Sequence, residues 1–325
     1  MYHRRAPAPA TGNIPPSALR PPQPPSALRP PLPPSAPRPP RIPTAPRPSR
    51  PLQPQPPRRR GDDVCVRLVW AENLMSELAT IRALLPRYPY VTIHAEHGGG
   101  DADELGRLAL PPGVREEDLP ASARYALAKI DVDAFPLLQL GITLCDAHGR
   151  LPELPSPGAT AAAESVWQVG LPARDPSCIK ALAHALFVSG VVSSGTWGKV
   201  TWVVHGGLYH LGFLLKVLTG GAPLPDTRRE FLAALRAYLG RSVFDVRYVA
   251  ARLPKGVKLR GPLAYLAALL GAPAAEARRP WQAGEKSLAA CQVFMRIKGL
   301  YFAWDGIDMH AGCIDGLHLP PRSSS

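Results

Sequence analysis

Proline is distributed so unevenly along this 325-residue chain that it decides how much of the chain can fold. The first 60 residues hold 22 of the 41 prolines and 11 arginines, and they contain no lysine, aspartate or glutamate. Such a segment cannot bury enough apolar surface to offset the entropy lost on ordering. We therefore expect a disordered Pro/Arg-rich tail over residues 1–63 with local polyproline II structure, one folded domain over 64–318 and a flexible C-terminus over 319–325.

The tail also carries most of the charge. The formal net charge of the chain is +13, and the 11 arginines of the tail leave the rest close to neutral. The tail repeats a Ser-Ala-x-Arg-Pro-Pro motif that begins at Ser17, Ser26 and Ser35. Two interpretations stay open: a low-complexity extension without a specific role, or a docking strip for proline-binding modules or RNA phosphates.

Targeting signals are sparse. No hydrophobic run approaches the length of a membrane span, and the first residues lack the apolar core of a signal peptide. The five cysteines are dispersed and form no Cys-x-x-Cys pair, which indicates buried thiols in a reducing compartment and no structural zinc. We expect a protein of the nucleus and cytoplasm that does not enter a membrane. The cysteines are Cys65, Cys145, Cys178, Cys291 and Cys313.

Apolar periodicity predicts alternating strands and helices beyond residue 64. We expect strands over 88–96, 137–145, 166–169, 200–205 and 243–246. We expect helices over 73–85, 179–188, 211–218, 231–239, 263–270 and 287–297, and a loop with helical fragments over 100–125. This alternation is typical of an α/β sheet covered by helices on both faces.

One expected strand has the spacing of a nuclease motif. Metal-dependent nucleases hold two divalent cations with several carboxylates. The first pair often lies on one strand as Asp-x-Glu, because residues i and i+2 share a face. Here the strand reads His94-Ala-Glu96. The spacing is that of the motif, but histidine stands at the first position.

Several segments of this part of the chain resemble the Caf/Pop-type deadenylases, the small nuclease subunits of the Ccr–Not complex. They occur in the family's order from about residue 64 to about residue 300. The best matches are Val69-Trp-Ala-Glu-Asn-Leu, Tyr88-Pro-Tyr-Val, Leu138-Gln-Leu-Gly-Ile-Thr-Leu with Gly149-Arg-Leu-Pro, Ser189-Gly-Val-Val, Leu214-Leu-Lys-Val-Leu-Thr and Gln282-Ala-Gly.

The resemblance implies a ribonuclease-H-like exonuclease fold of the DEDD superfamily, with a mixed sheet. It implies trimming of mRNA poly(A) tails from the 3′ end by two Mg²⁺ or Mn²⁺ ions. It also implies that the scaffold and nuclease subunits of the Ccr–Not complex are partners.

The catalytic motifs depart from the family pattern. His94 and His210 stand at aspartate positions, Trp281 replaces the histidine expected as general base, and Lys286 replaces a further aspartate. Of five expected metal-ligand positions, only Glu96 and Asp245 keep an acid. Their two negative charges are partly offset by the positive charge of Lys286, which leaves too little negative charge for two divalent ions. Magnesium prefers anionic oxygen over imidazole, so we predict a pseudoenzyme that binds no metal ion productively.

Alternatives remain for these residues. The histidines, with Glu96 and Asp245, could form a transition-metal site or could be drifted positions without a ligand. Lys286 could hold both carboxylates as an ion pair, or could pair with its neighbour Glu285, which is also a possible substitute ligand. Trp281 could stack on adenine or fill the space of the lost groups. The histidines in question are His94, His97, His205 and His210.

Three functions follow from this reading. The first is a non-catalytic member of the deadenylase family that acts as a binding or scaffold subunit in poly(A)-tail shortening. The second is a weakly active metal-dependent 3′-5′ exoribonuclease. The third is an RNA-binding protein that acts through its Arg/Pro tail.

Overall fold

The structure of the protein is a computed structural model. It describes residues 64–98, 110, 113–155, 161–172, 175, 177–192, 200–253, 257, 259–272, 282–302 and 306–318. The expected tail over 1–63, the C-terminus over 319–325 and Trp281 lie outside these residues.

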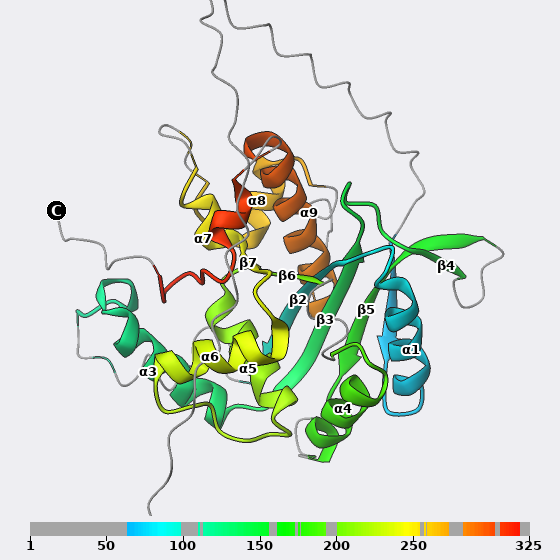
Figure 1. Cartoon of the computed structure of the whole chain (residues 1–325), viewed down its shortest axis with the longest axis horizontal. Coiled ribbons are helices and arrows are strands. Elements are labelled where there is room, and N and C mark those ends of the chain that lie inside the picture. The colour runs from blue at the N-terminus through cyan, green and yellow to red at the C-terminus, as the bar shows by residue number, and fades with distance from the viewer. Residues whose placement is uncertain are drawn as a thin grey trace, which may run out of the picture. The chain divides into compact units, whose positions relative to one another are not determined.

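A mixed β-sheet forms the centre of the described domain (Figure 1). Its strands lie in the order β1-β5-β3-β2-β6-β7, and β4 pairs with β5 beside this path. β3 runs antiparallel to both β2 and β5, while β1–β5, β2–β6 and β6–β7 are parallel pairs. The strands are β1 (Cys65–Val69), β2 (Tyr90–His97), β3 (Leu137–Cys145), β4 (Glu153–Pro155), β5 (Ala162–Gly170), β6 (Thr201–Val204) and β7 (Val243–Asp245).

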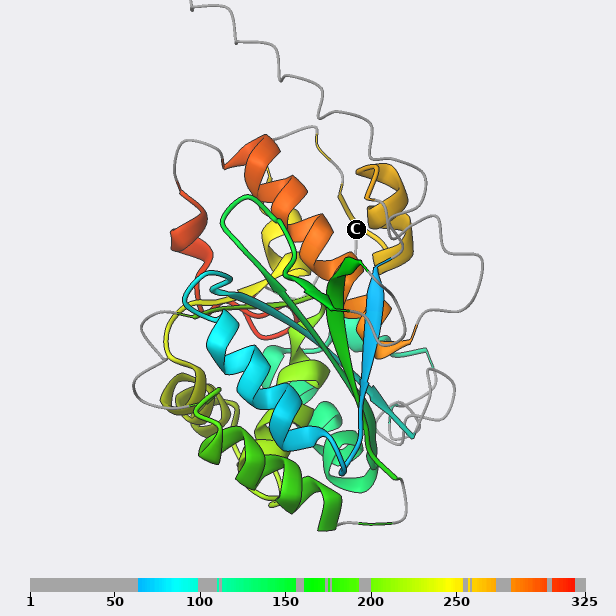
Figure 2. The same ribbon diagram turned by 90° about the vertical axis from the view of Figure 1, so that its right-hand side faces the viewer.

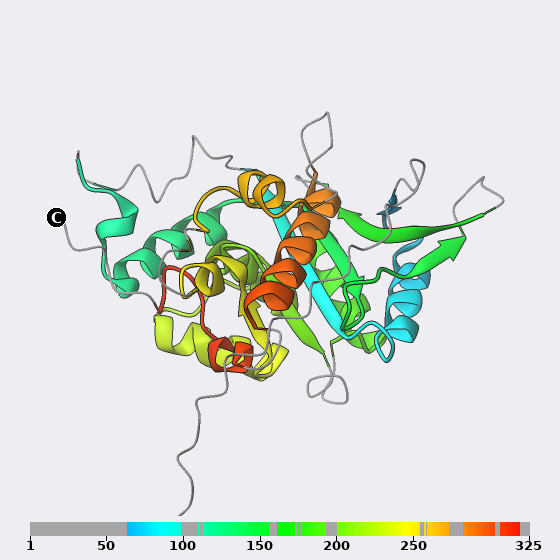
Figure 3. The same ribbon diagram turned by 90° about the horizontal axis from the view of Figure 1, so that it is seen from above.

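Helices cover both faces of this sheet (Figures 1 and 2). One face packs against α1 (Leu74–Leu84), α3 (Ala121–Ala134), α4 (Ser177–Val188), α5 (Gly207–Leu218) and α6 (Arg228–Leu239). The other face packs against α7 (Val246–Ala250), α8 (Leu263–Leu269) and α9 (Ala283–Tyr301). Figure 3 shows α9 crossing the sheet. Two short 3₁₀ helices, η1 (Glu116–Asp118) and η3 (Ile307–His310), complete the secondary structure of the described residues.

The central helix of the first face is α5. Ten of its twelve residues are buried, since it lies between the sheet and helices α3, α4 and α6. A helix that is apolar on nearly all sides is typical of such a central position. The buried ammonium of Lys216 on α5 donates to the carbonyls of Val132, Asp133 and Phe135 at the C-terminal end of α3. These bonds satisfy carbonyls that a helix end leaves without a partner.

The expected fold class, an α/β sheet with helices on both faces, is confirmed. The strand predicted over 137–145 has the predicted bounds, and the other predicted strands and helices are present with small shifts at their ends. Three elements differ more from the predictions. The loop with helical fragments expected over 100–125 contains η1 and the start of α3, but α3 continues beyond it to Ala134. In addition, α5 begins four residues before position 211, and β5 extends to Ala162–Gly170.

The prediction that the cysteines are buried is confirmed only in part. All five are free thiols, but only Cys145 and Cys291 are fully buried, and the other three are partly exposed. The two buried thiols lie 3.3 Å apart between β3 and α9. None of the helices in the described ranges combines the length and apolar composition that crossing a bilayer requires.

Candidate functional site

Strand β2 places His94 and Glu96 on one face of the sheet, as their spacing predicts. His94 Nε2 donates to Glu96 Oε1 over 2.9 Å. A bulge then separates Glu96 from His97 in the pairing with β3. His97 stacks on the ring of Phe213 at a centroid distance of 4.8 Å.

The turn from β6 into α5 brings two further imidazoles beside this strand. Gly206, at φ +75°, makes the turn possible because only glycine adopts that conformation without strain. His205 precedes the turn, and His210 lies on α5 with its ring centroid 4.1 Å from that of His94. The backbone N–H of Ala95 donates to His210 Nδ1 over 3.2 Å. The position expected for an aspartate is therefore filled by a buried imidazole that is hydrogen-bonded to β2.

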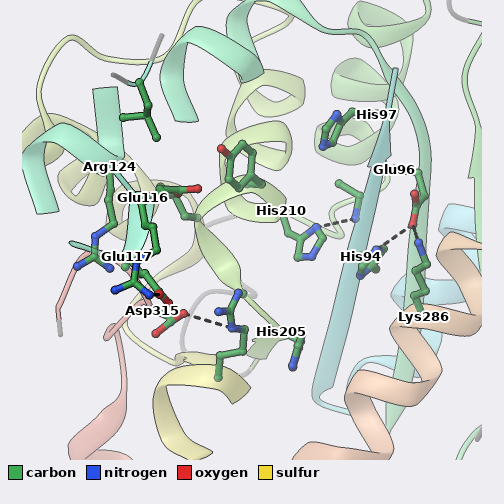
Figure 4. A pocket seen from close by; sticks show the side chains of 18 of the residues that line it. His94, Glu96, His97, Glu116, Glu117, Arg124, His205, His210, Lys286 and Asp315 are labelled. Carbon is green, nitrogen blue, oxygen red and sulfur yellow. Dashed lines mark hydrogen bonds and ion pairs between the residues drawn. The ribbon is translucent and has the colours of Figure 1, made fainter. Parts of the chain in front are cut away.

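Helix α9 supplies Lys286 from the other side of the sheet (Figure 4). Its ammonium donates to Glu96 Oε1, the same oxygen that accepts from His94. The side chains of Lys286 and Glu96 are each about one-third exposed, at 33% and 31%. The ammonium thus lies at the carboxylate that the family resemblance assigned to a metal ion.

A glutamine clamp, made by Gln139, Gln168 and Gln282, holds the start of α9 on the sheet. Gln168 donates to Gln282 Oε1 over 2.7 Å and accepts from the N–H of Gly284. Gln139 accepts from the N–H of Ala283. These contacts satisfy backbone groups at the helix start and fix the direction in which Lys286 leaves the helix.

Asp245 is placed differently from the sequence interpretation. Its carboxylate is fully buried and accepts four backbone N–H groups at 2.8 to 3.0 Å. It caps α7 and joins the starts of α5 and α7 to the C-terminal segment, and it is not part of the ion pair between Lys286 and Glu96. The donors are the N–H groups of Gly206, Gly207, Arg247 and Asp315. In this structure Asp245 is a structural cap, and its role as a remnant metal ligand stays a prediction.

Glu285 also has a local structural role. Its Oε2 accepts from the N–H of Gln282 over 2.8 Å and closes a capping box at the start of α9. This contact directs the carboxylate along its own helix end. The ammonium of Lys286 pairs with Glu96, one of the two partners that the sequence suggested for it in an ion pair.

A pocket of about 860 Å³ brings these groups together with others that the sequence interpretation missed. His94, Glu96, His205, His210 and Lys286 lie at one end, and a second group comes from η1, α3, α7 and the C-terminal segment (Figure 4). Arg247 pairs with Asp315 over 3.3 Å. No local motif marks this second group, since only the tertiary fold unites its members. Its charged members are Arg115, Glu116, Glu117, Arg124, Arg247 and Asp315.

Burial controls the protonation of the imidazoles. It lowers the pKa of His94, lowers the pKa of His205 to about 3 and lowers that of His210 well below its usual value. For Glu96, burial favours the protonated form, but hydrogen bonds from His94 and Lys286 outweigh it and lower the pKa to about 2. At neutral pH the site therefore holds uncharged imidazoles around one carboxylate that is neutralised by an ammonium.

Within the described residues, no three His, Cys, Asp or Glu side chains are arranged to hold a metal ion together. The histidines approach one another without converging as a ligand set, so the suggested transition-metal site is not formed in this conformation. Trp281, at the expected position of the general base, lies outside the described residues.

Comparison with known proteins places this geometry in a family. No protein-family model matches the sequence. Over 281 residues the chain is 26% identical to the probable CCR4-associated factor 1 homolog 7 of Arabidopsis thaliana, spanning 79% of this chain and 95% of that protein. It is 26% identical over 260 residues to the poly(A) ribonuclease pop2 of Schizosaccharomyces pombe, spanning 73% and 70% respectively. The chain is homologous to the Caf/Pop-type deadenylases over most of its length.

Solved structures give the same fold. The S. pombe Pop2p structure, in a Mg²⁺ and Mn²⁺ bound form, aligns with a TM-score of 0.59 at 24% identity, covering 78% of this chain and 99% of that one. CAF1 co-crystallised with the yeast NOT1 MIF4G domain aligns at 0.58 and 23%, covering 77% and 96%. The ribonuclease-H-like exonuclease fold expected from the sequence is confirmed.

Matches to the Caf/Pop-type deadenylases and departures from them have different structural roles in this chain. Gln139, Gly141 and Gln282 lie in segments that match the family, and each contributes to the docking of α9 on the sheet. The departures at His94, His210 and Lys286 all line the pocket. The framework has therefore been kept while the chemistry of the pocket has changed.

Proposed function

We propose that this chain is a catalytically inactive member of the Caf/Pop-type deadenylase family that acts as a binding subunit of the Ccr–Not complex in mRNA poly(A)-tail shortening. The observation that carries the proposal is the ion pair between Lys286 and Glu96. Phosphodiester cleavage by two metal ions requires carboxylates that are open to both ions. Here the carboxylate of Glu96 already has a cation as its partner.

The pair of divalent cations used by the family does not fit these residues. Glu96 is the only carboxylate among the five residues at its end of the pocket. The carboxylate oxygens of Asp245 already accept four backbone N–H groups. The neighbouring groups are neutral imidazoles, which are poor ligands for magnesium. A cation that approached Glu96 would also meet the ammonium of Lys286 at close range, where like charges repel strongly.

A trimming assay tests the loss of activity. Purified full-length protein is incubated with labelled poly(A) and Mg²⁺ or Mn²⁺, beside the poly(A) ribonuclease pop2 of S. pombe as an active reference. We expect turnover no greater than that of Glu96→Gln, because neither protein can hold the metal pair. Metal-dependent trimming by the wild type that disappears in Glu96→Gln would show a working nuclease and would refute the proposal.

Fold similarity to CAF1 co-crystallised with the yeast NOT1 MIF4G domain supports the binding role. A protein that keeps the framework of the nuclease can keep an outer surface for a scaffold after its chemistry is lost. We propose a scaffold domain of the MIF4G type as the partner, encountered in the nucleus or cytoplasm.

Co-purification tests this part separately. The full chain and the MIF4G domain of its own organism's NOT1-type scaffold are mixed and passed over a sizing column. We expect one co-eluting complex, with Glu96→Gln behaving like the wild type because the pocket is not the binding surface. Separate elution at micromolar concentrations of both proteins would count against the scaffold role.

A further inference from the structure

Helix α9 runs along strand β3 in a regular register (Figure 2). At the start of the helix, a Cβ added to Gly141 would lie 1.9 Å from the carbonyl oxygen of Ala283. One step further along, the hydroxyl groups of Thr143 and Ser287 are 2.8 Å apart. Two residues of a strand and four residues of a helix both return to the same face, and both advance by about 6–7 Å. The two elements therefore meet at repeated contacts along one seam.

The third contact of this seam is a pair of thiols. Cys145 lies two residues beyond Thr143, and Cys291 lies four residues beyond Ser287. The S–H group of Cys291 donates to the Sγ of Cys145 over 3.3 Å, and both residues are free, buried thiols. The sulfur atoms of a disulfide are about 2.05 Å apart, so an approach of about 1.2 Å would join these two. The register of the helix on the strand thus places the thiols where a covalent bond can form.

The surroundings of the thiol pair leave a route for a small oxidant. The two sulfurs belong to a small apolar cluster with Leu151, Val166 and Leu288, which is separate from the two larger clusters of the core. The outer neighbours of this cluster are only partly buried, so a local opening here exposes the sulfurs at a lower cost than an opening of the main core. These neighbours are Val64, Val66, Tyr90 and Met295.

Protonation makes the first step of an oxidation slow, and geometry makes the second step fast. The hydrogen bond with Cys291 and burial raise the pKa of the Cys145 thiol, although the nearby ammonium of Lys298 acts in the opposite direction. Because peroxides react with thiolates, the intact pair is oxidised slowly. Once one sulfur has been oxidised, the other already lies beside it, so the second step needs no diffusion.

We propose that Cys145 and Cys291 form an oxidative modification site, which hydrogen peroxide converts into a disulfide between β3 and α9. In the first step one sulfur takes an oxygen from the peroxide, which gives a sulfenic acid and one water. In the second step the remaining thiol attacks that sulfur, so that the S–S bond forms, the S–O bond breaks and a second water leaves. Two electrons pass from the thiols to the peroxide, and the two thiol protons end in the water. A dithiol reductant reverses the change.

The disulfide fixes the part of α9 that carries the ion pair of the pocket. Lys286, whose ammonium pairs with Glu96, lies five residues before Cys291 on the same helix. A bond between cysteines that are 146 residues apart also restricts the unfolded chain strongly. The oxidised protein is therefore the more stable form. This difference between the two forms does not depend on whether the chain cleaves RNA.

Peptide mapping of the oxidised full chain tests the site. Reduced protein is treated with hydrogen peroxide in its folded state, the remaining thiols are alkylated, and the protein is digested with trypsin without a reductant. We expect a disulfide that links the peptides 130–150 and 287–296, which contain Cys145 and Cys291 and are bounded by tryptic cleavage sites. Dithiothreitol should separate the two peptides.

Thermal unfolding measures the consequence of the link. Oxidation should raise the Tm of the wild type by about 5 °C or more, as expected for a bond that closes a long loop. Cys291→Ala should show neither the linked peptides nor the rise in Tm. Cys145→Val, whose side chain suits a strand, is a second variant for the same purpose if the first fails to fold. The matched control is Cys178→Ser, which removes a partly exposed thiol from α4 and should keep both the link and the rise.

Three results would overturn the inference. The first is the absence of the link after the partly exposed cysteines have been oxidised. The second is a link that forms only in urea, because the thiols would then be unable to meet in the folded protein. The third is a linked protein whose Tm is unchanged or lower than that of the reduced form.

Discussion

Two acidic residues that look alike in the sequence have opposite environments in the structure. Glu96 is partly exposed, lies in the pocket and is paired with Lys286. Asp245 is fully buried and accepts four backbone N–H groups, while burial itself raises the pKa of its carboxyl group. The first belongs to the pocket, and the second is part of the framework.

This difference predicts unequal effects on stability. Asp245→Ala leaves four N–H groups, buried or partly buried, without their acceptor and should lower the free energy of unfolding by about 3 kcal/mol or more. Glu96→Gln disrupts a partly exposed ion pair and should cost about 1 kcal/mol or less. Urea unfolding followed by tryptophan fluorescence measures both values. Similar losses in the two variants would contradict the assignment of Asp245 as a structural cap.

Restoring carboxylates should restore affinity for metal ions. The double variant His94→Asp with Lys286→Asp replaces an imidazole and an ammonium by two carboxylates, which makes three carboxylates together with Glu96. Hard divalent cations prefer such anionic oxygen ligands, so we expect Mn²⁺ to bind at least tenfold more tightly than to the wild type. Isothermal titration calorimetry measures this, and Lys180→Asp, which adds an acid on exposed α4, is the control. An unchanged affinity in the double variant would show that charge is not what excludes the metal.

At the scale of elements, close packing between β3 and α9 sets the position of Lys286. A Cβ added to Gly141 would lie 1.9 Å from the carbonyl oxygen of Ala283, closer than any real contact. The first turn of α9 therefore approaches the strand through a space that only glycine leaves open.

Gly141→Ala should consequently displace the start of α9 and lower the free energy of unfolding by about 3 kcal/mol or more. Gly299→Ala is the matched control, because nothing lies within 4 Å of the added Cβ near the other end of the same helix. It should raise stability by about 0.5–1 kcal/mol, since alanine favours helix over glycine. Thermal unfolding of both variants measures these changes, and a neutral Gly141→Ala would refute the close approach.

Strongly periodic elements were predictable from the sequence, and those that depend on distant partners were not. The apolar run Leu137–Cys145 gave β3 its bounds. Only the start of helix α3, which has Pro120 at its N-cap, fell within a segment predicted to contain helical fragments. Helix α5 begins at Gly207, before the predicted start at Leu211, and no local pattern marks that position. In the structure Gly206 and Gly207 form the tight turn against Asp245.

The same division applies to the pocket. Residue spacing and resemblance placed His94, Glu96, His210 and Lys286 together, because each stands at a motif position. Arg124 and Arg247 had no such pattern, and they reach the pocket only through the packing of α3 and α7. The capping role of Asp245 could not be predicted for a related reason, since a motif gives the residue type but not the N–H groups that surround its carboxylate.

At the scale of the whole molecule, the buried histidines should make stability depend on pH. In the unfolded chain an imidazole binds a proton near pH 6.5. In the folded protein burial lowers the pKa of His205 to about 3 and lowers the pKa of His210 as well. The unfolded state therefore binds more protons between these values, and stability falls as the pH decreases below about 6.5.

The expected slope is up to about 1.4 kcal/mol per pH unit for each histidine. Urea unfolding at a series of pH values from neutral to about 5 measures it, and His205→Gln should reduce the slope by removing one of the groups. A free energy of unfolding that is constant over this range would show that these imidazoles are protonated in the folded protein.

The ion pair between Lys286 and Glu96 makes a return to the family's metal site depend on several substitutions made together. Replacing the lysine alone removes a cation but leaves histidines at two ligand positions, and restoring a single acid leaves the ammonium in place. Under the proposed function, no single substitution returns the protein to hydrolysis, so intermediates on the way back gain nothing for selection to act on. In that case a lineage with this lysine is committed to a use of the fold other than cutting RNA.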